Sequence, residues 1–559
     1  MGKLFKEFTE EKLNEIRTHP YYKPALEGIR KRAEKFLATD PPRIKFSQIH
    51  MFVTTGNRSV FQDVYSNYQT RMEDYFFLYL VDQDEKYLEP LADIIWNICD
   101  FESWSIPAHV GEHLDPERRR RNLDLCSTIL AARVAEVIYY VGDKLPELVV
   151  KRAKYEVRYR LIESYAMYSE KDFWWMKSTN NWSSVCIGAT LTAYLYAAEK
   201  EEIDAQLPRM IETARCYLRG FDDEGCCLEG YTYWGYGFSY FCLFASMLRD
   251  YTDGEIDLFK DPKVHEIALF QQNMAITNNK SISFSDCGNA SFSPANWLSQ
   301  YLKHEYPDME IPSIPQTVGG SALRYFFWQY PEYAESEMKP KSKIFENAQW
   351  FISRRPRYTV ACKAGHNNEP HNHNDVGSFV IAKNGKTTFT DPGAGEYTRQ
   401  YFSSERYTLF ACASRGHSVP LINGAEQVTS DVKSTVYEAE LDKRYYFNME
   451  NAYRVPALIS LKRDFNCDEE GFTVTDEYQF TEAPESVVER FVSYEQPKQT
   501  EAGRVVCGDS IMTYDPDVFE YELTSDIIIR GNGTGPTVWI VDLKVKKLEK
   551  SFKVSVRFE

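Results

Sequence analysis

The sequence predicts a multidomain α+β protein in which a helical first part is followed by an antiparallel β-sandwich. Its 559 residues are too many for one ordinary domain. Apolar residues recur at helical spacing up to about residue 335, whereas short alternating runs separated by turn residues follow residue 345. We therefore expect two domains, residues 1–340 and residues 341–559.

The stretch 115–141 illustrates the helical pattern. Asp115 can cap a helix, Pro116 suits the first helical position, and Gly142 can end the helix. The apolar positions between them are Leu123, Cys126, Leu130, Val134, Val137 and Val141. Similar segments cover residues 75–101, 183–200, 206–221 and 240–251. Many consecutive helices with broad apolar faces are typical of an α/α bundle, a solenoid or a toroid, and the lack of a strict repeat disfavours a regular solenoid.

The second part shows the period of two that is typical of strands. The alternating runs cover residues 358–365, 377–391, 435–441, 445–455, 458–467, 471–480, 537–545 and 551–559. Asn384 and Gly385 stand between two β-type segments, which predicts a tight hairpin. We expect an antiparallel sandwich, joined to the helical part by residues 327–345.

Composition and charge exclude several classes of function. The net charge of −17 argues against a general nucleic-acid binder, because phosphate contacts need a basic face. No uncharged apolar stretch is long enough for a membrane span, and residues 1–20 lack the apolar core of a signal peptide. The 12 cysteines lie scattered without a CxxC pair, as reduced thiols do. These features predict a cytoplasmic protein.

Histidines gather in one region, with four of the ten between His366 and His417. If "HNHND" enters a strand, His371 and His373 share one face. Asp391 in "TDPG" and His417 in "RGHSVP" follow on later segments that neighbouring strands could bring close. Two imidazoles and one carboxylate with an open fourth position suit zinc. The alternative is a set of satisfied polar residues at strand ends, and the residues alone favour neither interpretation.

Two predicted loops of the helical part are rich in aromatic and amide side chains. In "FWWMKSTNNWSSVC" either serine after Trp182 can cap a helix, which leaves Asn181 to donate to a ligand. In "DDEGCCLEGYTYWGYGFSY" one acid and several aromatic residues surround glycines, namely Glu229, Tyr231, Tyr233, Trp234 and Tyr236. A sugar-binding cleft and a cap on the helical core both explain this composition, with the core cap favoured for Trp182 and Trp234.

The ordered motifs "NNW", "EGYTYWGYG", "HNHND", "TDPG" and "RGHSVP" resemble those of the heparinase II/III-like polysaccharide lyases and the related alginate and oligoalginate lyases. The resemblance spans roughly residues 100–425. It implies an N-terminal (α/α) toroid, or incomplete barrel, followed by a C-terminal antiparallel β-sandwich. It also implies β-elimination at a uronic acid to give a 4,5-unsaturated product. That reaction must neutralise the C6 carboxylate, remove the C5 proton and protonate the leaving O4.

The resemblance also implies roles for individual residues. His371 matches the active-site histidine, as base or as carboxylate neutraliser. Tyr233 matches the acid, which in some versions is also the base, with Tyr236 as the fallback, and Asn181 matches the asparagine that answers the carboxylate. The implied ligands of a mainly structural Zn²⁺ are His373, Asp391 and His417. Trp182 and Tyr236, within the matching motifs, are candidate substrate contacts. Further candidates from the sequence itself are Glu229, His109 and Arg406, the last as a local positive charge.

The sequence departs from the family pattern at two positions. Trp182 and Trp234 stand where many members have a histidine. A mechanism that uses such a histidine as the base is therefore excluded, and more of the chemistry falls on Tyr233 and His371. The expected partner is an anionic, uronate-containing oligosaccharide or polysaccharide, and a homo-oligomer is compatible with the sequence.

Two other functions remain open at this point. A glycoside hydrolase on the same toroid would use two carboxylates among Asp222, Asp223 and Glu229. A non-catalytic carbohydrate-binding protein, or a scaffold stabilised by metal, would keep the same aromatic residues without turnover. The sequence does not distinguish among uronate polymers, nor between endo and exo cleavage.

Overall fold

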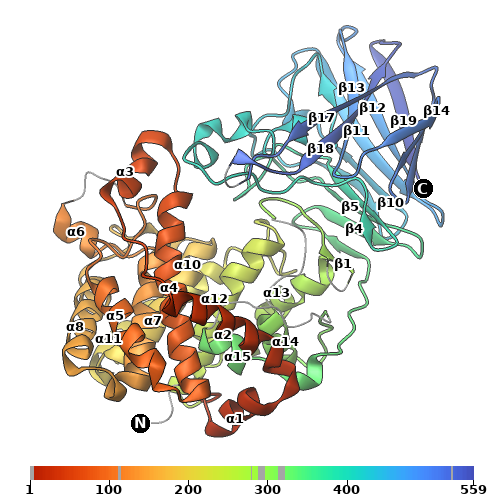
Figure 1. Cartoon of the computed structure of the whole chain (residues 1–559). Helices are drawn as coiled ribbons and strands as arrows, with labels where there is room; N and C mark the ends of the chain where they lie inside the picture. Colours follow the sequence, from red (N-terminus) through yellow and green to blue (C-terminus); the bar gives the residue numbers. More distant parts are fainter. Residues whose placement is uncertain (1–4, 111–114, 278–279, 288–295, 313–321, 531–532) are drawn as a thin grey trace. The chain divides into compact units, whose positions relative to one another are not determined.

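The computed structural model describes residues 5–110, 115–277, 280–287, 296–312, 322–530 and 533–559 (Figure 1). The chain forms two compact units. Unit 1 comprises Met1–Phe221, Trp234–Ala268 and Ser293–Ser336, and unit 2 comprises Asp222–Tyr233, Leu269–Phe292 and Glu337–Glu559. Two short segments that lie among helices in the sequence therefore pack with the β-strands.

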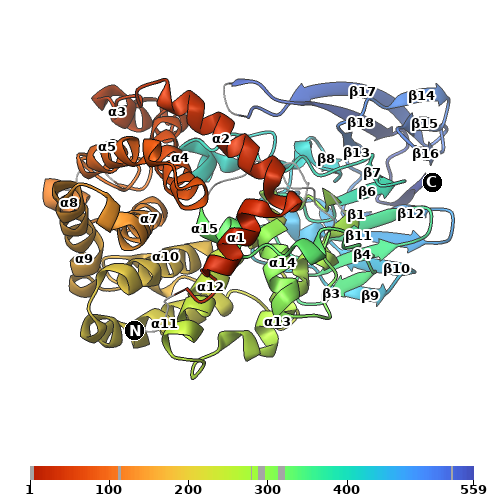
Figure 2. The ribbon, with the colours of Figure 1, turned by 60° about the horizontal axis from the view of Figure 1, so that its bottom comes forward.

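The first part of the chain is helical, as predicted. The helices are α1 (Glu10–Thr18), α2 (Lys23–Leu37), α3 (Phe46–Thr55), α4 (Ser59–Asp82), α5 (Leu88–Cys99), α6 (Pro116–Arg120), α7 (Leu125–Val141), α8 (Glu147–Val157), α9 (Glu163–Met167), α10 (Asn181–Ala197), α11 (Lys200–Leu218), α12 (Tyr231–Tyr251), α13 (Pro262–Asn273), α14 (Asn296–Glu305) and α15 (Leu323–Phe327). Figure 2 shows α5, α8 and α11 outside α4, α7, α10 and α12, as in an incomplete double ring of helices.

Aromatic side chains fill the core of unit 1. Trp104 and Trp175 are each 1% exposed, and their indole N–H groups donate to the carbonyls of Ile98 and Leu123, both at 2.9 Å. The hydroxyl of Tyr65 donates to the carbonyl of Trp104 at 2.7 Å. Large amphipathic rings bury apolar surface here while pairing their polar atoms with loop carbonyls, which explains much of the aromatic content.

The predicted single helix over residues 115–141 is wrong. Asp115 caps α6 by accepting from the backbone N–H of Arg118, as expected. The chain then breaks, and Asp124 caps α7 by accepting from the backbone N–H of Ser127 at 2.7 Å. A second capping aspartate inside the stretch thus starts a new helix, because its carboxylate satisfies N–H groups that a helix start leaves without partners.

Within the described part of the chain, one segment, Leu125–Lys144, is long and apolar enough to cross a membrane. Two-thirds of its most apolar window, 67%, is buried inside the protein. The same segment buries Arg133 and Glu136, which form an ion pair at 3.1 Å. Core helices of globular proteins share this length and apolarity, so these properties are weak evidence for a span.

The second part of the chain forms antiparallel sheets. One sheet has the order β3 (Lys343–Phe345), β4 (Trp350–Arg354), β5 (Thr359–Lys363), β6 (Phe379–Lys383), β7 (Lys386–Thr387). Another has the order β14 (Lys498–Glu501), β15 (Arg504–Cys507), β16 (Ser510–Tyr514), β19 (Ser551–Phe558), β12 (Phe472–Phe480), β11 (Leu458–Cys467), β10 (Arg444–Asn448), β9 (Val436–Glu440). A third has the order β17 (Phe519–Ile527), β18 (Thr537–Val545), β13 (Val487–Ser493), β8 (Leu421–Ile422). Separately, β1 (Ala275–Thr277) pairs with β2 (Lys280–Ser281).

The three larger sheets share one apolar core. The ring of Phe379 in β6 lies 5.5 Å from Phe558 in β19 and 6.1 Å from Phe491 in β13. The predicted hairpin is confirmed, since β6 and β7 pair across Asn384 and Gly385, whose φ angles are 51° and 73°. Two left-handed residues in a row are what a type I′ turn requires.

Candidate active site and metal-binding cluster

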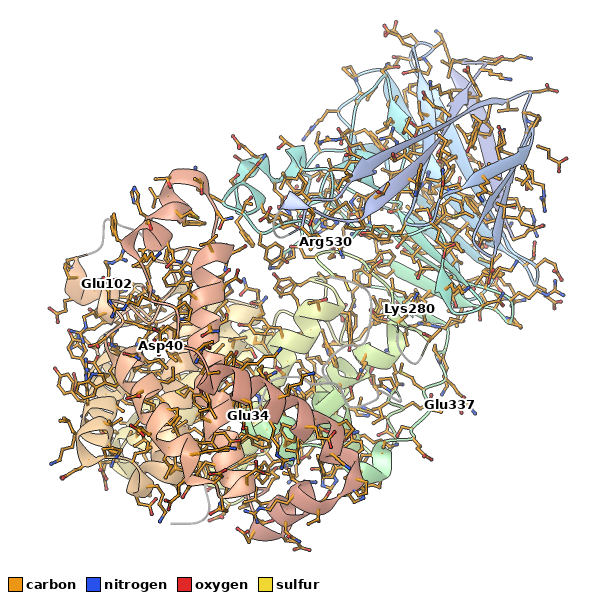
Figure 3. All side chains as sticks on the ribbon, in the orientation of Figure 1. Glu34, Asp40, Glu102, Lys280, Glu337 and Arg530 are labelled. Carbon is orange, nitrogen blue, oxygen red and sulfur yellow. The ribbon has the colours of Figure 1, made fainter. Side chains whose placement is uncertain are left out.

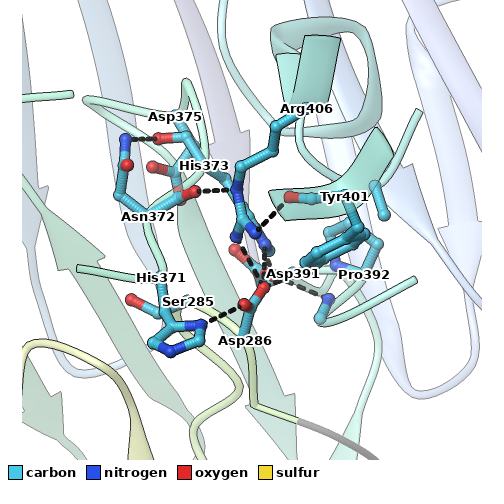
Figure 4. Close-up of polar contacts among 12 residues, drawn as sticks. Ser285, Asp286, His371, Asn372, His373, Asp375, Asp391, Pro392, Tyr401 and Arg406 are labelled. Carbon is cyan, nitrogen blue, oxygen red and sulfur yellow. Dashed lines mark hydrogen bonds and ion pairs between the residues drawn. The ribbon is translucent and has the colours of Figure 1, made fainter. Parts of the chain in front are cut away.

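One buried carboxylate, Asp286, collects side chains from separate segments of unit 2. Its Oδ2 accepts a hydrogen bond from His371 Nδ1 at 2.6 Å, and its Oδ1 lies 3.0 Å from His373 Nε2. Arg406 Nη2 donates to the same Oδ1 at 2.8 Å, and the hydroxyl of Tyr401 also donates to it. Figure 4 shows His371 and Arg406 pointing toward Asp286.

The partners of Asp286 fix its charge. Burial would raise the pKa of Asp286, but the hydrogen bonds from His371 and His373 and the charge of Arg406 outweigh burial and hold that pKa well below its usual range. Asp286 therefore stays ionised, and each histidine carries a proton on the nitrogen that faces it. The other ring nitrogens, His371 Nε2 and His373 Nδ1, face different surroundings.

His371 faces a group of residues suited to proton transfer. Its ring stacks on Tyr233, with centroids 3.9 Å apart and planes inclined by 24°. Its Nε2 lies 3.4 Å from Glu229 Oε2. The hydroxyl of Tyr233 donates to that of Tyr397 at 2.8 Å. We call Glu229, Tyr233, His371 and Tyr397 the proton-transfer group.

Both tyrosines of this group are held as neutral phenols. Burial, followed by the charge of Asp286, raises the pKa of Tyr233 well above that of a free tyrosine. The same two causes, in the same order, raise the pKa of Tyr397. At neutral pH a half-buried phenol with a raised pKa is able to donate a proton, and it is poorly suited to act as a preformed phenolate base.

Tyr233 lies on a helix, not on the loop that the sequence predicts. Helix α12 begins at Tyr231, directly after Gly230, whose φ is 91°. Gly237 lies inside this helix. A Cβ at this position would come within 3.1 Å of Asn181 Cβ and 2.8 Å of the Tyr217 hydroxyl, which explains why the residue is a glycine. The glycines of this motif therefore permit close helix packing instead of a tight turn. Trp234 is fully buried and donates to the carbonyl of Ile267 at 2.7 Å, so the core interpretation holds for that residue.

The predicted N-terminal cap of helix α10, which follows the "NNW" motif, is also corrected. Helix α10 begins at Asn181, and the side chain of Asn180 caps it by accepting from the backbone N–H of Trp182. Ser183 and Ser184 lie within the helix and donate to the carbonyls of Ser178 and Gly237. Asn181 is 2% exposed, at the first turn of α10 in unit 1.

The other predicted contact residues of unit 1 form an aromatic group. The ring of Trp182 packs at a tilt against His109, with centroids 4.7 Å apart, and against Trp174 at 5.0 Å. His109 Nδ1 lies 2.7 Å from Asp124 Oδ2, and its Nε2 lies 3.4 Å from Arg58 Nη2. Tyr236 also belongs to unit 1, where its ring packs edge to face against Tyr240.

Arg406 is engaged inside unit 2. It is 8% exposed, and its Nε and Nη1 donate to the carbonyls of Asn372 at 3.1 Å and Tyr401 at 3.3 Å. With Nη2 on Asp286, these donors hold the loop that carries His371. The contact geometry is that of a brace between two loops.

The histidine stretch is a loop, so the prediction that strand alternation places both rings on one face is wrong. Strand β6 begins only at Phe379, and His371 has a left-handed φ of 58°. The two rings meet on Asp286 because a loop turns them there. Buried Arg463 of β11 donates from Nη1 to the carbonyls of Gly377 and Ser418, at 2.8 and 2.9 Å, and so ties this loop to the one that carries His417.

Next to this site, buried donor atoms converge in a second cluster. His373, Asp375, Asp391 and His417 each offer an atom within 4.8 Å of the others, and all four side chains are buried. His417 Nδ1 lies 3.2 Å from Asp391 Oδ2, and His373 Nδ1 lies 3.9 Å from Asp391 Oδ1. We call these four residues the metal-binding cluster. The sequence predicts three of them, and the structure adds Asp375.

The converging atoms fit a bound cation. His373 Nδ1, His417 Nδ1 and Asp391 Oδ2 are buried and have no hydrogen-bond partner among the described residues. Each such atom costs about 1–3 kcal/mol when left without a partner. The opposite nitrogens of the rings face Asp286 and, at 3.1 Å, the carbonyl of Ala411, which leaves both Nδ1 lone pairs directed into the cluster. Asp375 Oδ1 also pairs with Lys363 Nζ at 2.8 Å. Two imidazoles and two carboxylates match the donors of a divalent metal site.

Several of these residues were missed by sequence reasoning. Asp286 lies 85 positions before His371, and its local sequence "FSDCGN" carries no motif. Tyr397 follows "TDPG" in a stretch without regular structure. A signal existed only for Asp375, which ends the quoted "HNHND". The remaining residues come close only through the tertiary fold.

The chain is similar to known proteins in fold and in one part of its sequence. Residues 337–494 match the family model described as "Heparinase II/III-like, C-terminal". A heparinase III structure is 13% identical, with a TM-score of 0.63, over 98% of this chain and 92% of that one. A heparan sulfate lyase from Pedobacter heparinus is 13% identical, with a TM-score of 0.59, over 98% and 90% of the two chains.

A third similar structure is the chondroitin AC lyase of Streptomyces coelicolor A3 in complex with chondroitin sulphate. It is 9% identical, with a TM-score of 0.58, over 98% of this chain and 81% of that one. No curated protein sequence matches the chain. The predicted resemblance to the heparinase II/III-like family and the predicted toroid with a β-sandwich are confirmed. At these identities the structural likeness concerns the fold.

Proposed function

We propose that the protein is a polysaccharide lyase that cleaves uronate-containing glycans by β-elimination, with Tyr233 as the acid and His371 as the base. The observation that carries this proposal is the stack of His371 on a half-buried, protonated Tyr233, with an ionised Asp286 on the other side of the histidine. The match of residues 337–494 to the heparinase II/III-like C-terminal model supports the reaction class.

The proposed reaction assigns one step to each member of the proton-transfer group. His371 Nε2 takes the C5 proton, the C5–H electrons form the C4–C5 double bond, and the C4–O4 bond breaks. Tyr233 gives its proton to the leaving O4. Tyr397, which is hydrogen-bonded to Tyr233, then helps to return a proton to Tyr233. The carboxylates of Asp286 and Glu229 stabilise the imidazolium formed on His371. Asn181 is the proposed donor to the C6 carboxylate.

The metal-binding cluster would hold Zn²⁺ through His373, Asp391, His417 and Asp375. Four protein donors describe a closed, structural type of site. The ion would supply positive charge to a buried set of lone pairs and fix the loops that carry His371. The chemistry at the substrate belongs to the proton-transfer group.

The hydrolase alternative has less support from the geometry. Asp222 accepts from the backbone N–H groups of Glu224 and Cys226, so its carboxylate stabilises a turn. Glu229 does lie beside His371, but the carboxylate on the other side, Asp286, is fully buried and engaged by four side chains. An acid and base pair for hydrolysis needs two carboxylates that both reach the sugar.

The proposal is tested by incubating the protein with a panel of heparan sulfate, chondroitin sulfate, hyaluronan and alginate. We expect an increase in ultraviolet absorbance from the 4,5-unsaturated product on at least one glycan. Tyr233→Phe prepared in parallel serves as the control for contaminating lyases. Reducing sugar without the chromophore would instead indicate a hydrolase, and binding without any product would indicate a non-catalytic protein.

The role of His371 is tested separately. His371→Gln keeps a side-chain donor but has no basic nitrogen. If His371 is the base, the Gln and Ala variants lose turnover equally. Substantial turnover in His371→Gln alone would show that the side chain neutralises the carboxylate instead.

A further inference from the structure

We propose that unit 1 carries a subsite for an anionic sugar residue, made of other residues than the proton-transfer group. The subsite is a pocket of about 480 Å³ formed by α4, by the end of α5 with the loop after it, and by the segment that leads into α3. The inference extends the proposed function, since it adds an anionic subsite to the predicted glycan cleft. A pocket of this volume is large enough for more than one sugar ring.

Aromatic rings form one wall of the pocket. Phe61 and Tyr68 lie two turns apart on α4, and each is 5% exposed. Tyr68 packs edge to face against Phe101, with centroids 5.0 Å apart. The small exposed parts of these rigid rings give the concave site an apolar wall that a pyranose can contact.

Polar atoms in the pocket lack protein partners. The hydroxyl of Tyr68 and the side-chain amide of half-buried Asn97 line the pocket, are open to solvent, and make no hydrogen bond within the described ranges. Their positions on one pocket fit the hydroxyl groups of a sugar, which both donate and accept hydrogen bonds.

Among the charged pocket residues that the structure describes, one cation has no ion-pair partner. Asp100 is paired with Arg152, and Glu102, labelled in Figure 3, accepts from Arg119 at 2.8 and 3.1 Å. Arg43 also lines the pocket, is exposed, and forms no ion pair with any residue that the structure describes. A guanidinium without a partner selects a carboxylate or a sulfate, which it binds through two parallel N–H groups.

Short stretches of chain connect the pocket to the aromatic group of Trp182. Pro107 lines it two residues before His109, and Arg58, which approaches His109 at 3.4 Å, lies one turn before Phe61. The rings of His109 and Trp182 pack against each other at a tilt of 58°. In the proposed binding mode, a sugar chain on Trp182 extends past His109 and brings a further residue to Arg43. Long chains then gain a contact that short chains cannot reach.

The test compares a disaccharide and an octasaccharide prepared from heparan sulfate and from chondroitin sulfate. Binding is measured by calorimetry in the Tyr233→Phe background, so that the probes are not cleaved. Arg43→Gln removes the charge, and Tyr68→Phe removes only the hydroxyl and keeps the ring. The matched control is Lys31→Gln, an exposed cation on α2 outside the pocket. Circular dichroism verifies that each variant is folded.

We expect Arg43→Gln to weaken octasaccharide binding about tenfold, as loss of a charged hydrogen bond does. Tyr68→Phe should weaken it less, and disaccharide binding should change in neither variant. Equal octasaccharide affinity in all variants would overturn the subsite, even for an active lyase. Equal loss in Lys31→Gln would also overturn it, because only a diffuse charge effect would remain. If the wild type makes no unsaturated product while the Arg43 effect persists, the proposed function fails and the subsite stands.

Discussion

His371 and His373 are two residues apart and share one carboxylate, yet their surroundings differ in kind. The side chain of His371 is 19% exposed, and its second nitrogen faces Glu229. The side chain of His373 is fully buried, and its second nitrogen faces Asp391 and has no hydrogen-bond partner among the residues described. Asp286 fixes the first nitrogen of both rings. The function of each histidine therefore depends on what its other nitrogen meets.

The difference separates two tasks in neighbouring sites. In the proton-transfer group the side chain of His371 is partly exposed and both tyrosines are neutral phenols. A group that exchanges protons with a substrate needs both properties. The metal-binding cluster has converging buried lone pairs, which a bound cation needs. Each of the following variants changes one side of this comparison or the link between the sides.

The largest effect is expected at the proton-transfer group. Tyr233→Phe should lower kcat about 10³-fold, because general acid catalysis of this kind contributes that order of magnitude. Metal content and melting temperature should not change. The assay is the ultraviolet absorbance of the product. A larger loss in Tyr236→Phe than in Tyr233→Phe would assign the acid to Tyr236.

The next effect concerns Arg463, whose side chain connects the loop of His373 to the loop of His417. Arg463 pairs with Asp476 at 2.8 Å, and both are buried. Arg463→Met should reduce the free energy of unfolding by about 3–5 kcal/mol, since it leaves a buried charge without its partner. Urea unfolding measures this loss. Arg357→Met is the matched control, because its pair with Glu470 is exposed and such pairs contribute less than about 1 kcal/mol. Equal losses in the two variants would contradict the bracing role.

Asp286→Asn tests the link between the two sites. An amide cannot accept from both histidines as the carboxylate does, so metal affinity should fall about 10-fold to 100-fold and kcat should fall with it. Competition with a chromogenic chelator measures the first quantity. Glu229→Gln is the control that should lower kcat alone. A variant Asp286→Asn with normal metal affinity would show that the two histidines are not coupled through this carboxylate.

The smallest effect is expected at Tyr397. Tyr397→Phe removes the acceptor of the Tyr233 proton and should lower kcat about tenfold, the loss of one buried hydrogen bond. KM should not change, because the substrate contacts remain. Tyr437→Phe on β9 is the exposed control. A change in KM without a change in kcat would assign Tyr397 to substrate binding.

The regular elements could be predicted because they depend on local pattern. Apolar spacing found α10 and α11, alternation found the long strands, and Asn384 with Gly385 fixed one hairpin. Predictions failed where one local signal has two physical meanings. The glycine-rich stretch around Tyr233 is predicted to be a loop, but Gly237 serves close packing inside α12, and Asp124 starts a new helix inside an apparent single one.

The candidate sites were predictable only in part. Three donors of the metal-binding cluster follow from residue type and from the family resemblance. Asp286 could not be found, because nothing in its local sequence indicates that loops carrying His371 and Arg406 close over it. The left-handed φ of 58° at His371 was likewise not indicated by the sequence.

The most direct test of the account measures bound metal, melting temperature and turnover in His371→Ala and His373→Ala side by side. We predict that His371→Ala keeps its full metal content and melting temperature while turnover is lost. We predict that His373→Ala loses the metal and melts at a lower temperature, because metal binding contributes to folding. Metal loss in His371→Ala, or full metal content with normal melting in His373→Ala, would contradict the separation of the two roles.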